Sequence, residues 1–259
     1  MLLNSGVRSR ARSLGLALVM GSVAHPRVHG ATDEAIWNDL AQRFVAQGRV
    51  DYAGFAAERA ALDRYLAASA EADPFRLSSD AARLAFWINA YNACVVKSVL
   101  DHQPLSSVKD VRGFFNRVRF RVAGRELTLD GIEGEGRKLK DWRIHFAVVC
   151  ASTSCPPIRP EAYTAQRLDA QLAEQVREFL RDERNGLRLE DSTLWVSSIF
   201  KWYAKDFVPG TLTAESLLQL LRPHLDPVAA QAMGDRALTL TFLPYDWSLN
   251  AQAKPAGGA

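Results

Sequence analysis

The chain has 259 residues, of which 48% are hydrophobic and 24% are charged, and its formal net charge is +3. This length allows one large domain or two small ones with a substantial core, and it leaves disorder to the two ends. Four arginines and no acidic residue precede residue 31, so the remaining chain has 28 basic and 29 acidic residues. This near-neutral balance gives no electrostatic reason to expect nucleic acid or an anionic membrane as a partner.

The first thirty residues have the three parts of a secretory signal. Three arginines between residues 8 and 12 form a basic region, residues 14–24 form a short apolar core, and Ser22-Val23-Ala24 offers a cleavage site. The apolar run is shorter than the ~20 residues that a membrane-spanning helix needs. We therefore expect a signal peptide at 1–30, a mature start between residues 25 and 32, and a periplasmic or secreted protein without membrane attachment after cleavage.

Helical periodicity dominates the first half of the domain, with apolar residues at helical spacing over 36–45 and 62–69. The clearest helix runs from Leu84 to Val99, where Trp87 and other apolar residues widen the stripe until most faces look buried. Asn89 and Asn92 interrupt this apolar surface. Their amides need hydrogen-bond partners inside the protein.

The period changes to two after Pro104. Residues 118–122 and 127–129 predict a hairpin around Ala123-Gly124, and residues 187–196 predict a second one. Apolar residues predict a central strand at 143–150 and a last strand at 238–242, and further helices are expected at 168–180, 198–206 and 213–222. This order predicts an α+β fold, with a helical N-terminal half packed on a mostly antiparallel sheet.

Domain organisation follows from the same pass along the chain. No internal repeat and no Pro/Gly/Ser-rich linker divides it, so we expect a single globular domain at 31–250 and a disordered tail at 251–259. The order of elements also permits a papain-like or transglutaminase-like arrangement.

The segment 144–157 is the strongest candidate for chemistry. A small-residue loop follows the predicted strand, and Pro156-Pro157 would stiffen its far side. A thiol needs a base or a positive neighbour to act as a nucleophile near neutral pH, and His145 is the one histidine within forty residues of Cys155. An acid would orient the imidazole, and Glu133, Asp169 and Asp246 are candidates for that role.

Other interpretations of the same residues stay open. Cys150 and Cys155 could form a disulfide in an oxidising compartment, and His145 could be a satisfied core histidine. The odd number of cysteines leaves at least one unpaired in a monomer, and Cys94 in the buried helix could be that one. One histidine and two cysteines lack the spacing of a metal site, so we expect neither a metal nor a cofactor.

Two further patterns predict ordinary structure. The glycines at 131, 134 and 136 match neither nucleotide-binding spacing and are expected to form a plain turn. The arginines at 117, 119 and 121 are expected to form a solvated strand face.

Five stretches together resemble the domain of unknown function 547 family. They are Val50-Asp51-Tyr52, residues 85–93, residues 144–157, residues 199–203 with Asp206-Phe207, and residues 245–250. The resemblance implies that the family motif also has these residue types at Trp87, Asn89, Asn92, His145, Cys150, Cys155, Trp202, Asp206 and Asp246. It also hints at thiol chemistry, because some relatives join this domain to a glutaredoxin-like module. The chain departs from the family pattern at Gly134, where the family usually has histidine after the acid at Glu133.

Three functional hypotheses follow. The first is an exported, thiol-dependent hydrolase or acyl-transfer enzyme with Cys155 as the nucleophile and His145 as the base. The second is a non-catalytic module that binds a small-molecule or peptidic ligand through Asn89, Asn92, Trp87, Trp202 and Asp206. The third is a thiol-redox protein.

Overall fold

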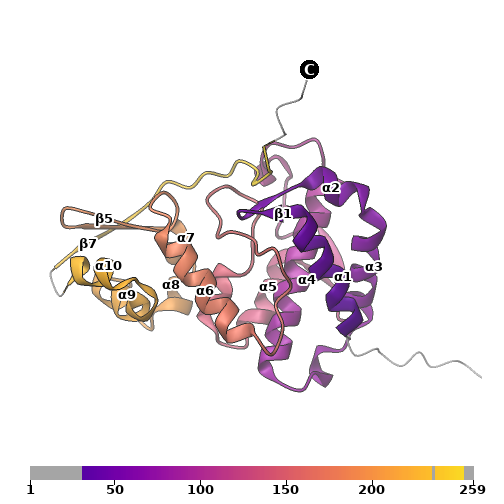
Figure 1. The fold of residues 1–259 in the computed structure, drawn as a ribbon, viewed down its shortest axis with the longest axis horizontal. Coiled ribbons are helices and arrows are strands. Elements are labelled where there is room, and N and C mark those ends of the chain that lie inside the picture. Colours follow the sequence, from indigo (N-terminus) through magenta and orange to yellow (C-terminus); the bar gives the residue numbers. More distant parts are fainter. Residues whose placement is uncertain (1–30, 235–236, 254–259) are drawn as a thin grey trace, which may run out of the picture.

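The computed structural model describes residues 31–234 and 237–253 (Figure 1). The predicted signal peptide lies outside the described residues, as do residues 254–259 of the predicted tail. The α-helices are α1 (Ala31–Phe44), α2 (Tyr52–Ala57), α3 (Arg59–Glu71), α4 (Asp80–Asp101), α5 (Leu129–Arg137), α6 (Leu168–Arg181), α7 (Ser198–Trp202), α8 (Ala204–Phe207), α9 (Ala214–Leu221) and α10 (Pro227–Met233). The strands are β1 (Val45–Ala46), β2 (Arg49–Val50), β3 (Arg119–Val122), β4 (Arg125–Thr128), β5 (Leu187–Glu190), β6 (Thr193–Val196) and β7 (Thr239–Phe242). Four 3-10 helices are η1 (Pro74–Arg76), η2 (Val108–Asp110), η3 (Trp142–Phe146) and η4 (Arg222–His224).

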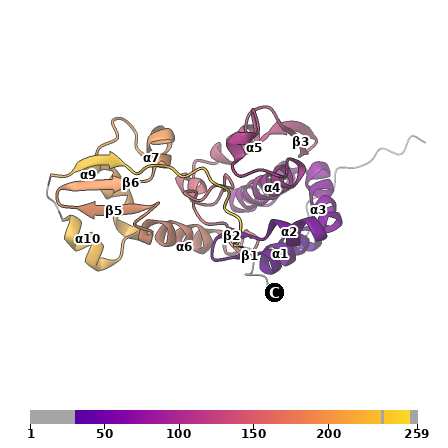
Figure 2. The same ribbon diagram turned by 90° about the horizontal axis from the view of Figure 1, so that it is seen from above.

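The predicted helix around residues 84–99 is α4, the central helix of the first half. It begins where the Ser79 side chain accepts a hydrogen bond from the Ala82 amide. Most of its 22 residues are buried, and it contacts α2, α3, α5 and α6. Figure 2 shows α4 between α1–α3 on one side and α5 with β3 on the other. A helix covered on so many sides explains why its sequence is apolar around most of its circumference.

The sheets are small, and antiparallel pairing predominates. β1–β2 and β3–β4 are antiparallel hairpins, while β5, β6 and β7 form a three-stranded sheet. β7 is parallel to β6 and pairs along the edge of β6 that β5 leaves free. The long connection through α7–α10 allows this parallel pairing. The α+β class and the helical N-terminal half are therefore confirmed. The arginines at 117, 119 and 121 are exposed, as expected of a solvated strand face.

Two hydrophobic clusters make up the core, and α6 belongs to both. Leu168 and Leu172 pack with α1–α5, whereas Val176 and Phe179 pack with β5–β7 and α7–α10. η3 is divided in the same way, since Ile144 lies in the first cluster and Phe146 in the second. Figure 2 shows α6 extending between the two ends of the molecule. The segment after η3 therefore lies where the two clusters meet.

The chain after β7 crosses back over the molecule and holds the loop at 151–154. This segment is the yellow trace that runs along the top of Figure 1. The amides of Thr153 and Ser154 donate to the carbonyls of Ser248 and Asp246, and the Asn250 amide donates to Ala151. Pairing continues past residue 250, where the predicted tail begins, because Ala251 forms a bridge with Val50.

The predicted central strand at 143–150 is wrong. The chain forms η3 there and then an irregular segment that belongs to no sheet. The Asn92 side chain forms the backbone hydrogen bonds that a neighbouring strand would otherwise form. Its Nδ2 donates to the Ala147 carbonyl at 2.9 Å, and its Oδ1 accepts from the Val149 amide at 3.0 Å. The segment is apolar because it is buried between helices, and a periodicity argument does not separate this case from a buried strand.

The predicted plain turn at the three glycines is also wrong, because they lie within α5. Thr128 caps this helix by accepting from the Gly131 amide. Gly136 faces the first cluster, where an added Cβ would lie 2.5 Å from Ile144 Cδ1 and 3.5 Å from Trp87 Cβ. Gly134 faces open space instead, with nothing within 4 Å of an added Cβ. An added Cβ at position 136 would thus crowd Ile144 of η3, whereas position 134 has room for one.

This contrast predicts opposite effects for two alanine substitutions in one helix. Gly136→Ala is expected to lower the free energy of unfolding by about 1–3 kcal/mol, because the methyl group must displace Ile144. Gly134→Ala is expected to raise it by about 1 kcal/mol, because alanine favours helix and meets no neighbour. Urea denaturation of both variants measures the two changes. Equal signs for the two substitutions would contradict the packing of α5.

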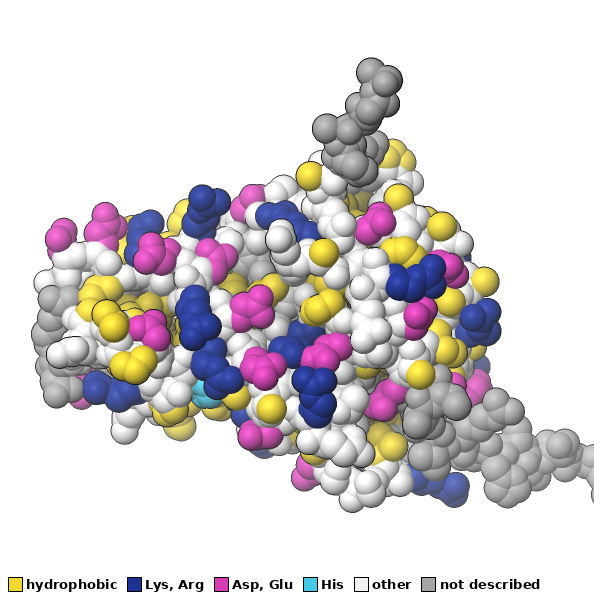
Figure 3. Space-filling view, viewed as in Figure 1, with side chains coloured by type: hydrophobic (Ala, Val, Ile, Leu, Met, Phe, Trp, Pro, Cys, Tyr) yellow, Lys and Arg dark blue, Asp and Glu magenta, His cyan; other side chains and the backbone are white. Residues whose placement is uncertain are grey.

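The face that carries α6 has mixed charge. Figure 3 shows basic and acidic side chains interspersed across it. Ion pairs account for several of them, including Arg159 with Glu174 at 2.9 Å and Arg143 with Asp169 at 2.8 Å. Exposed pairs of this kind contribute little to stability. Because both signs of charge are present, this face has no extended positive or negative potential.

Candidate active site

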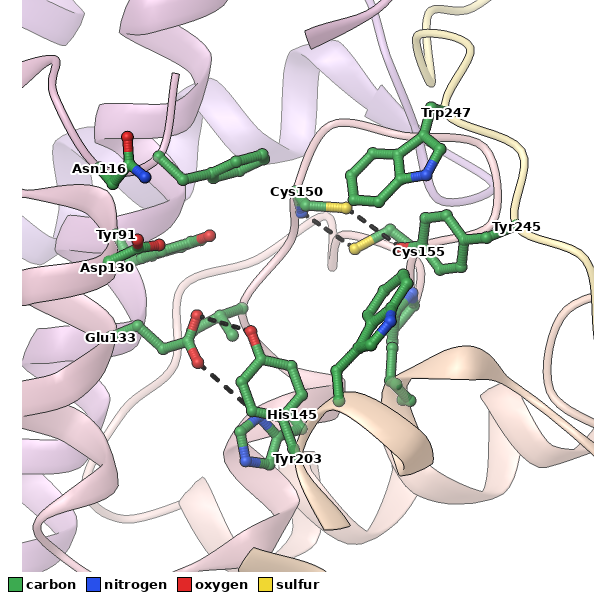
Figure 4. A pocket seen from close by; sticks show the side chains of 15 residues that line it. Tyr91, Asn116, Asp130, Glu133, His145, Cys150, Cys155, Tyr203, Tyr245 and Trp247 are labelled. Carbon is green, nitrogen blue, oxygen red and sulfur yellow. Dashed lines mark hydrogen bonds and ion pairs between the residues drawn. The ribbon is translucent and has the colours of Figure 1, made fainter. Parts of the chain in front are cut away.

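A cavity of about 280 Å³ opens beside the segment that follows η3. One wall comes from α5 and the other from residues 148–156, α7, Tyr203 and the returning C-terminal segment. Figure 4 shows Asp130 and Glu133 on one side of the space and the two cysteines with Tyr245 on the other. The lining residues are Tyr91, Phe115, Asn116, Asp130, Glu133, His145, Val148, Cys150, Cys155, Pro156, Ile199, Trp202, Tyr203, Tyr245 and Trp247.

Two free thiols lie side by side in this cavity. Cys150 and Cys155 are both partly buried, and neither is in a disulfide. The Cys155 Sγ accepts a hydrogen bond from the Cys150 amide at 2.9 Å. The Cys150 Sγ lies 2.8 Å from Ser152 Oγ and 3.2 Å from Tyr245 Oη. The disulfide considered from the sequence is therefore not formed in this structure, although the two side chains are neighbours.

The surroundings favour ionisation of Cys150 over Cys155. Burial opposes ionisation of the Cys150 thiol, but hydrogen bonds from Cys155, Ser152 and Tyr245 outweigh burial and lower its pKa to about 7. Burial and the neighbouring Cys150 thiolate raise the pKa of Cys155 well above its ordinary value. When the pair loses a proton near neutral pH, the negative charge is therefore held on Cys150.

A tight turn and the C-terminal segment bring the two thiols together. Ala151 has a positive φ of 57°, which is uncommon for a residue with a side chain and reverses the chain directly after Cys150. The Cys155 amide then donates to the Ser152 carbonyl. Because Tyr245 is on the segment that pairs with this loop, the pairing also delivers its hydroxyl to the Cys150 sulfur.

His145 is hydrogen-bonded to the carboxylate of Asp206 and not to a thiol. Its Nε2 lies 2.8 Å from Asp206 Oδ2, and its Nδ1 lies 3.9 Å from Glu133 Oε1. The Asp206 carboxylate is held in turn by Arg137 Nε at 2.6 Å. Among the described residues, no hydrogen bond joins His145 to Cys150 or Cys155. The predicted pair of Cys155 and His145 is therefore not hydrogen-bonded here, because Asp206 holds Nε2 and Nδ1 faces Glu133.

Burial keeps this acid–imidazole cluster in an unusual protonation state. It lowers the pKa of His145 to about 4, although the hydrogen bond to Asp206 works in the opposite direction. Burial also raises the pKa of Glu133 to about 7, against the hydrogen bond that Tyr203 Oη donates to it at 3.2 Å. A neutral imidazole that donates from Nε2 to Asp206 leaves Nδ1 as an acceptor facing Glu133. That Nδ1 has no hydrogen-bond partner among the described residues.

The structure separates the other predicted site residues into two groups. Trp202 lines the cavity, and Asp206 holds His145. Asn89, Asn92 and Trp87 are buried and do not line the cavity. The Asn89 amide binds the backbone of Tyr163 through both its nitrogen and its oxygen, and the Asn92 amide binds the backbone of Ala147 and Val149 in the same way. The Asp246 carboxylate accepts from the Ser248 amide, so it closes a turn and does not orient His145. The acid next to Nε2 is Asp206 instead.

Sequence reasoning missed three cavity residues that carry hydroxyl or carboxyl groups. Tyr245 and Tyr203 were part of stretches that resembled the family, but neither was singled out as a site residue. Asp130 was not singled out, although it precedes Glu133 by one helical turn on α5. Recognising α5 as a helix would have placed both acids on one face.

No metal centre is indicated by the described residues. Within 31–234 and 237–253, no group of three or more His, Cys, Asp or Glu side chains could hold a metal ion. The cavity offers thiol, carboxyl and hydroxyl chemistry in an aromatic setting.

Fold and cavity together define an α+β protein with a dithiol at the junction of its two hydrophobic clusters. Residues 75–180 match the family model described as "Protein of unknown function, DUF547", so the predicted resemblance is confirmed over this range. This range includes α4, α5, His145 and both cavity cysteines. It leaves out α7, α8 and the C-terminal segment, which supply Asp206 and Tyr245. Comparisons with curated proteins and with solved structures gave no match.

Proposed function

We propose that the protein is a thiol-dependent hydrolase or acyl-transfer enzyme in which Cys150, rather than Cys155, is the nucleophile. The observation that carries this proposal is the set of donors around the Cys150 sulfur, which faces the cavity. A thiolate is the reactive form of cysteine, and a pKa near neutrality makes it abundant without an adjacent base. Cys155 then acts as a donor to that thiolate.

Glu133 is suited to the proton transfers of this reaction. In the first step the Cys150 sulfur bonds to the substrate carbonyl carbon, the bond to the leaving group breaks, and protonated Glu133 gives its proton to that group. In the second step water or an amine attacks the thioester, Glu133 takes back a proton, and the Cys150 thiolate leaves. A carboxyl group with a pKa of about 7 can perform both transfers at neutral pH.

Tyr245 and His145 have supporting roles in this scheme. Burial raises the pKa of Tyr245, so its hydroxyl stays protonated and can donate to the oxyanion formed beside Cys150. His145 is a positioning residue, because Asp206 fixes its ring and its Nδ1 faces Glu133. The sequence had suggested His145 as the base and Glu133 as the group that orients it. In this proposal the roles are exchanged: Glu133 transfers the protons and His145 orients Glu133.

Labelling of the reduced protein with iodoacetamide between pH 5 and 9 tests the nucleophile. We expect fast alkylation of Cys150 with a midpoint near pH 7, located by peptide mass mapping. Cys155→Ser and Tyr245→Phe are each expected to raise that midpoint, because each changes a donor to the thiolate. Cys94→Ser is the matched control, since Cys94 is fully buried on α4. Preferential alkylation of Cys155, or a midpoint above about 8.5, the value of a free cysteine, would overturn the assignment.

A thiol-redox function is the second candidate, and the contact between the two thiols favours it. The Cys150 thiolate would attack a substrate disulfide and release one thiolate, and Cys155 would then attack the mixed disulfide, leaving a Cys150–Cys155 disulfide and a second thiol. Incubation of Cys155→Ser with oxidised glutathione tests this route. A stable mixed disulfide in the variant, with an internal disulfide in the unsubstituted protein, supports redox exchange, and its absence favours acyl transfer. A binding module without chemistry would show neither exchange nor fast alkylation.

Export is part of the proposal. The signal-like segment at 1–30 supports a periplasmic or secreted location, and the ligand is expected to be a small molecule or a peptide. In the described part of the chain, no helix combines the length and the apolar character needed to cross a membrane. Mass analysis of protein recovered from the periplasm or medium of an expression host should give an N-terminus between residues 25 and 32. Recovery of the intact N-terminus from the cytoplasm alone would contradict export.

A further inference from the structure

The two walls of the cavity differ in chemistry. Asp130 and Glu133 lie one turn apart on α5, and both side chains line the space. Figure 4 shows them across the cavity from Cys150 and Cys155. Glu133 is buried, whereas Asp130 is exposed at the rim. A ligand bound to Cys150 would therefore meet two carboxyl groups on its far side, one deep and one shallow.

The opposite wall is aromatic. Trp202, Tyr245 and Trp247 pack on one another with ring centroids 4.7–5.7 Å apart. Trp202 is 48% exposed, which is unusual for so large an apolar side chain. The faces of indole and phenol rings are negative and attract cations. Both walls therefore favour a ligand with positive charge and some apolar surface.

No lysine or arginine is among the described residues that line the cavity. Two basic groups lie near the cavity without lining it. Arg137 donates to Asp206 and also acts on Glu133 through its charge. Lys109 Nζ lies 4.4 Å from the centroid of the Trp247 ring, which leaves Trp202 and Tyr245, in the described part of the chain, as the rings without such a cation. The Asp130 carboxyl group therefore faces a cavity whose described lining residues include no basic group, and the Cys150 thiolate adds negative charge.

We propose that the substrate carries an ammonium or guanidinium group close to its reactive carbonyl. The cation lies beside the carboxyl groups of Asp130 and Glu133, the apolar part lies along Trp202 and Tyr245, and the carbonyl reaches Cys150. This inference rests on the proposed thiol chemistry for the position of the reacting carbonyl. The charge preference itself is a property of the cavity and can be measured without the natural substrate.

Methanethiosulfonates of different charge measure this preference at Cys150. The thiolate attacks the sulfenyl sulfur, a disulfide forms and methanesulfinate leaves, so all three reagents share one reaction. We compare the cationic trimethylammonioethyl, the anionic sulfonatoethyl and the neutral methyl reagent, locating the modified cysteine by peptide mapping. The ratio of cationic to anionic rates is expected to exceed that of a small free thiol by at least about tenfold.

Three variants on one helix assign that preference. Asp130→Asn is expected to reduce the rate ratio by about threefold, and Glu133→Gln is expected to reduce it only above about pH 7, where Glu133 is ionised. Glu135→Gln is the matched control: its carboxylate pairs with Arg125 and Lys138 and does not line the cavity, so the ratio should not change. A ratio equal to that of the free thiol, or an equal loss in Glu135→Gln, would overturn the inference.

The neutral reagent and a binding titration separate this inference from the proposed function. If the neutral reagent modifies Cys150 quickly and the charge ratio is flat, the nucleophile stands and the cationic substrate is wrong. If Cys150 is unreactive to all three reagents, the nucleophile fails. Tetramethylammonium then tests the cavity alone: in Cys150→Ser it should change tryptophan fluorescence, whereas the neutral tert-butanol should not. Equal responses to both probes would overturn the charge preference independently.

Discussion

Asn92→Ala is expected to lower the free energy of unfolding by about 4 kcal/mol. The Asn92 amide satisfies the Ala147 carbonyl and the Val149 amide, and all three groups are buried. Removing it leaves one backbone acceptor and one donor unsatisfied, and each such group costs about 1–3 kcal/mol. The same two bonds hold the segment that ends at Cys150. We therefore expect the variant also to lose selective alkylation of that thiol under native conditions.

Urea denaturation followed by fluorescence measures the first effect, and peptide mapping after brief alkylation measures the second. Asn116→Ala is the matched control, since Asn116 lines the cavity but is exposed, and a change below about 0.5 kcal/mol is expected for it. If Asn92→Ala is as stable as this control, the two hydrogen bonds from Asn92 to the backbone do not stabilise the fold. The predicted role of Asn92 in ligand binding would then be open again.

The sequence identified the segment that lines the cavity because residue types carry that information locally. Cys150, Cys155 and His145 are close in sequence, and all three line one cavity. Asn89 and Asn92 were correctly expected to need internal partners, since amides on an apolar helix must be satisfied. Their assignment to ligand binding did not follow from that need. A backbone segment crossing the helix can meet it equally well.

Long-range pairing was beyond the sequence. Asp206 is 61 residues from His145, and Tyr245 is 95 residues from Cys150. Nothing in local spacing indicates that a short helix and a returning C-terminal segment bring these groups together. The choice between the two thiols depends on the same contacts, because Tyr245 and Ser152 both reach Cys150. Sequence proximity therefore suggested Cys155 with His145, whereas tertiary packing gives each of them a different partner.

Opposing pH dependences are expected from Glu133 and His145. The pKa of Glu133 rises from 4.5 to about 7 on folding because of burial. Between these values the native state holds a proton that the unfolded state has released, so this group makes stability fall as pH rises. The pKa of His145 falls from 6.5 to about 4, also through burial. The unfolded state then binds the proton first, so His145 makes stability rise with pH between 4 and 6.5.

The two contributions oppose each other between pH 4.5 and 6.5, and single substitutions should expose them. Each is on the order of 3 kcal/mol across its full window, at about 1.4 kcal/mol per pKa unit. Relative to the unsubstituted protein, Glu133→Gln should gain stability as pH rises from 4.5 to 7. His145→Gln should lose stability between pH 4 and 6.5. Urea denaturation at half-unit pH steps gives both difference curves.

Glu135→Gln is again the matched control. Burial opposes ionisation of Glu135, but Lys138 and Arg125 outweigh it and lower the pKa of this carboxyl, so its difference curve should be flat above pH 4.5. Difference curves of the same sign for Glu133→Gln and His145→Gln would show that the carboxyl and the imidazole do not share a buried, neutral site. Glu133 would then be an ordinary carboxylate at neutral pH and could not supply the first proton of the proposed reaction. The pH experiment therefore tests the proton donor independently of the nucleophile.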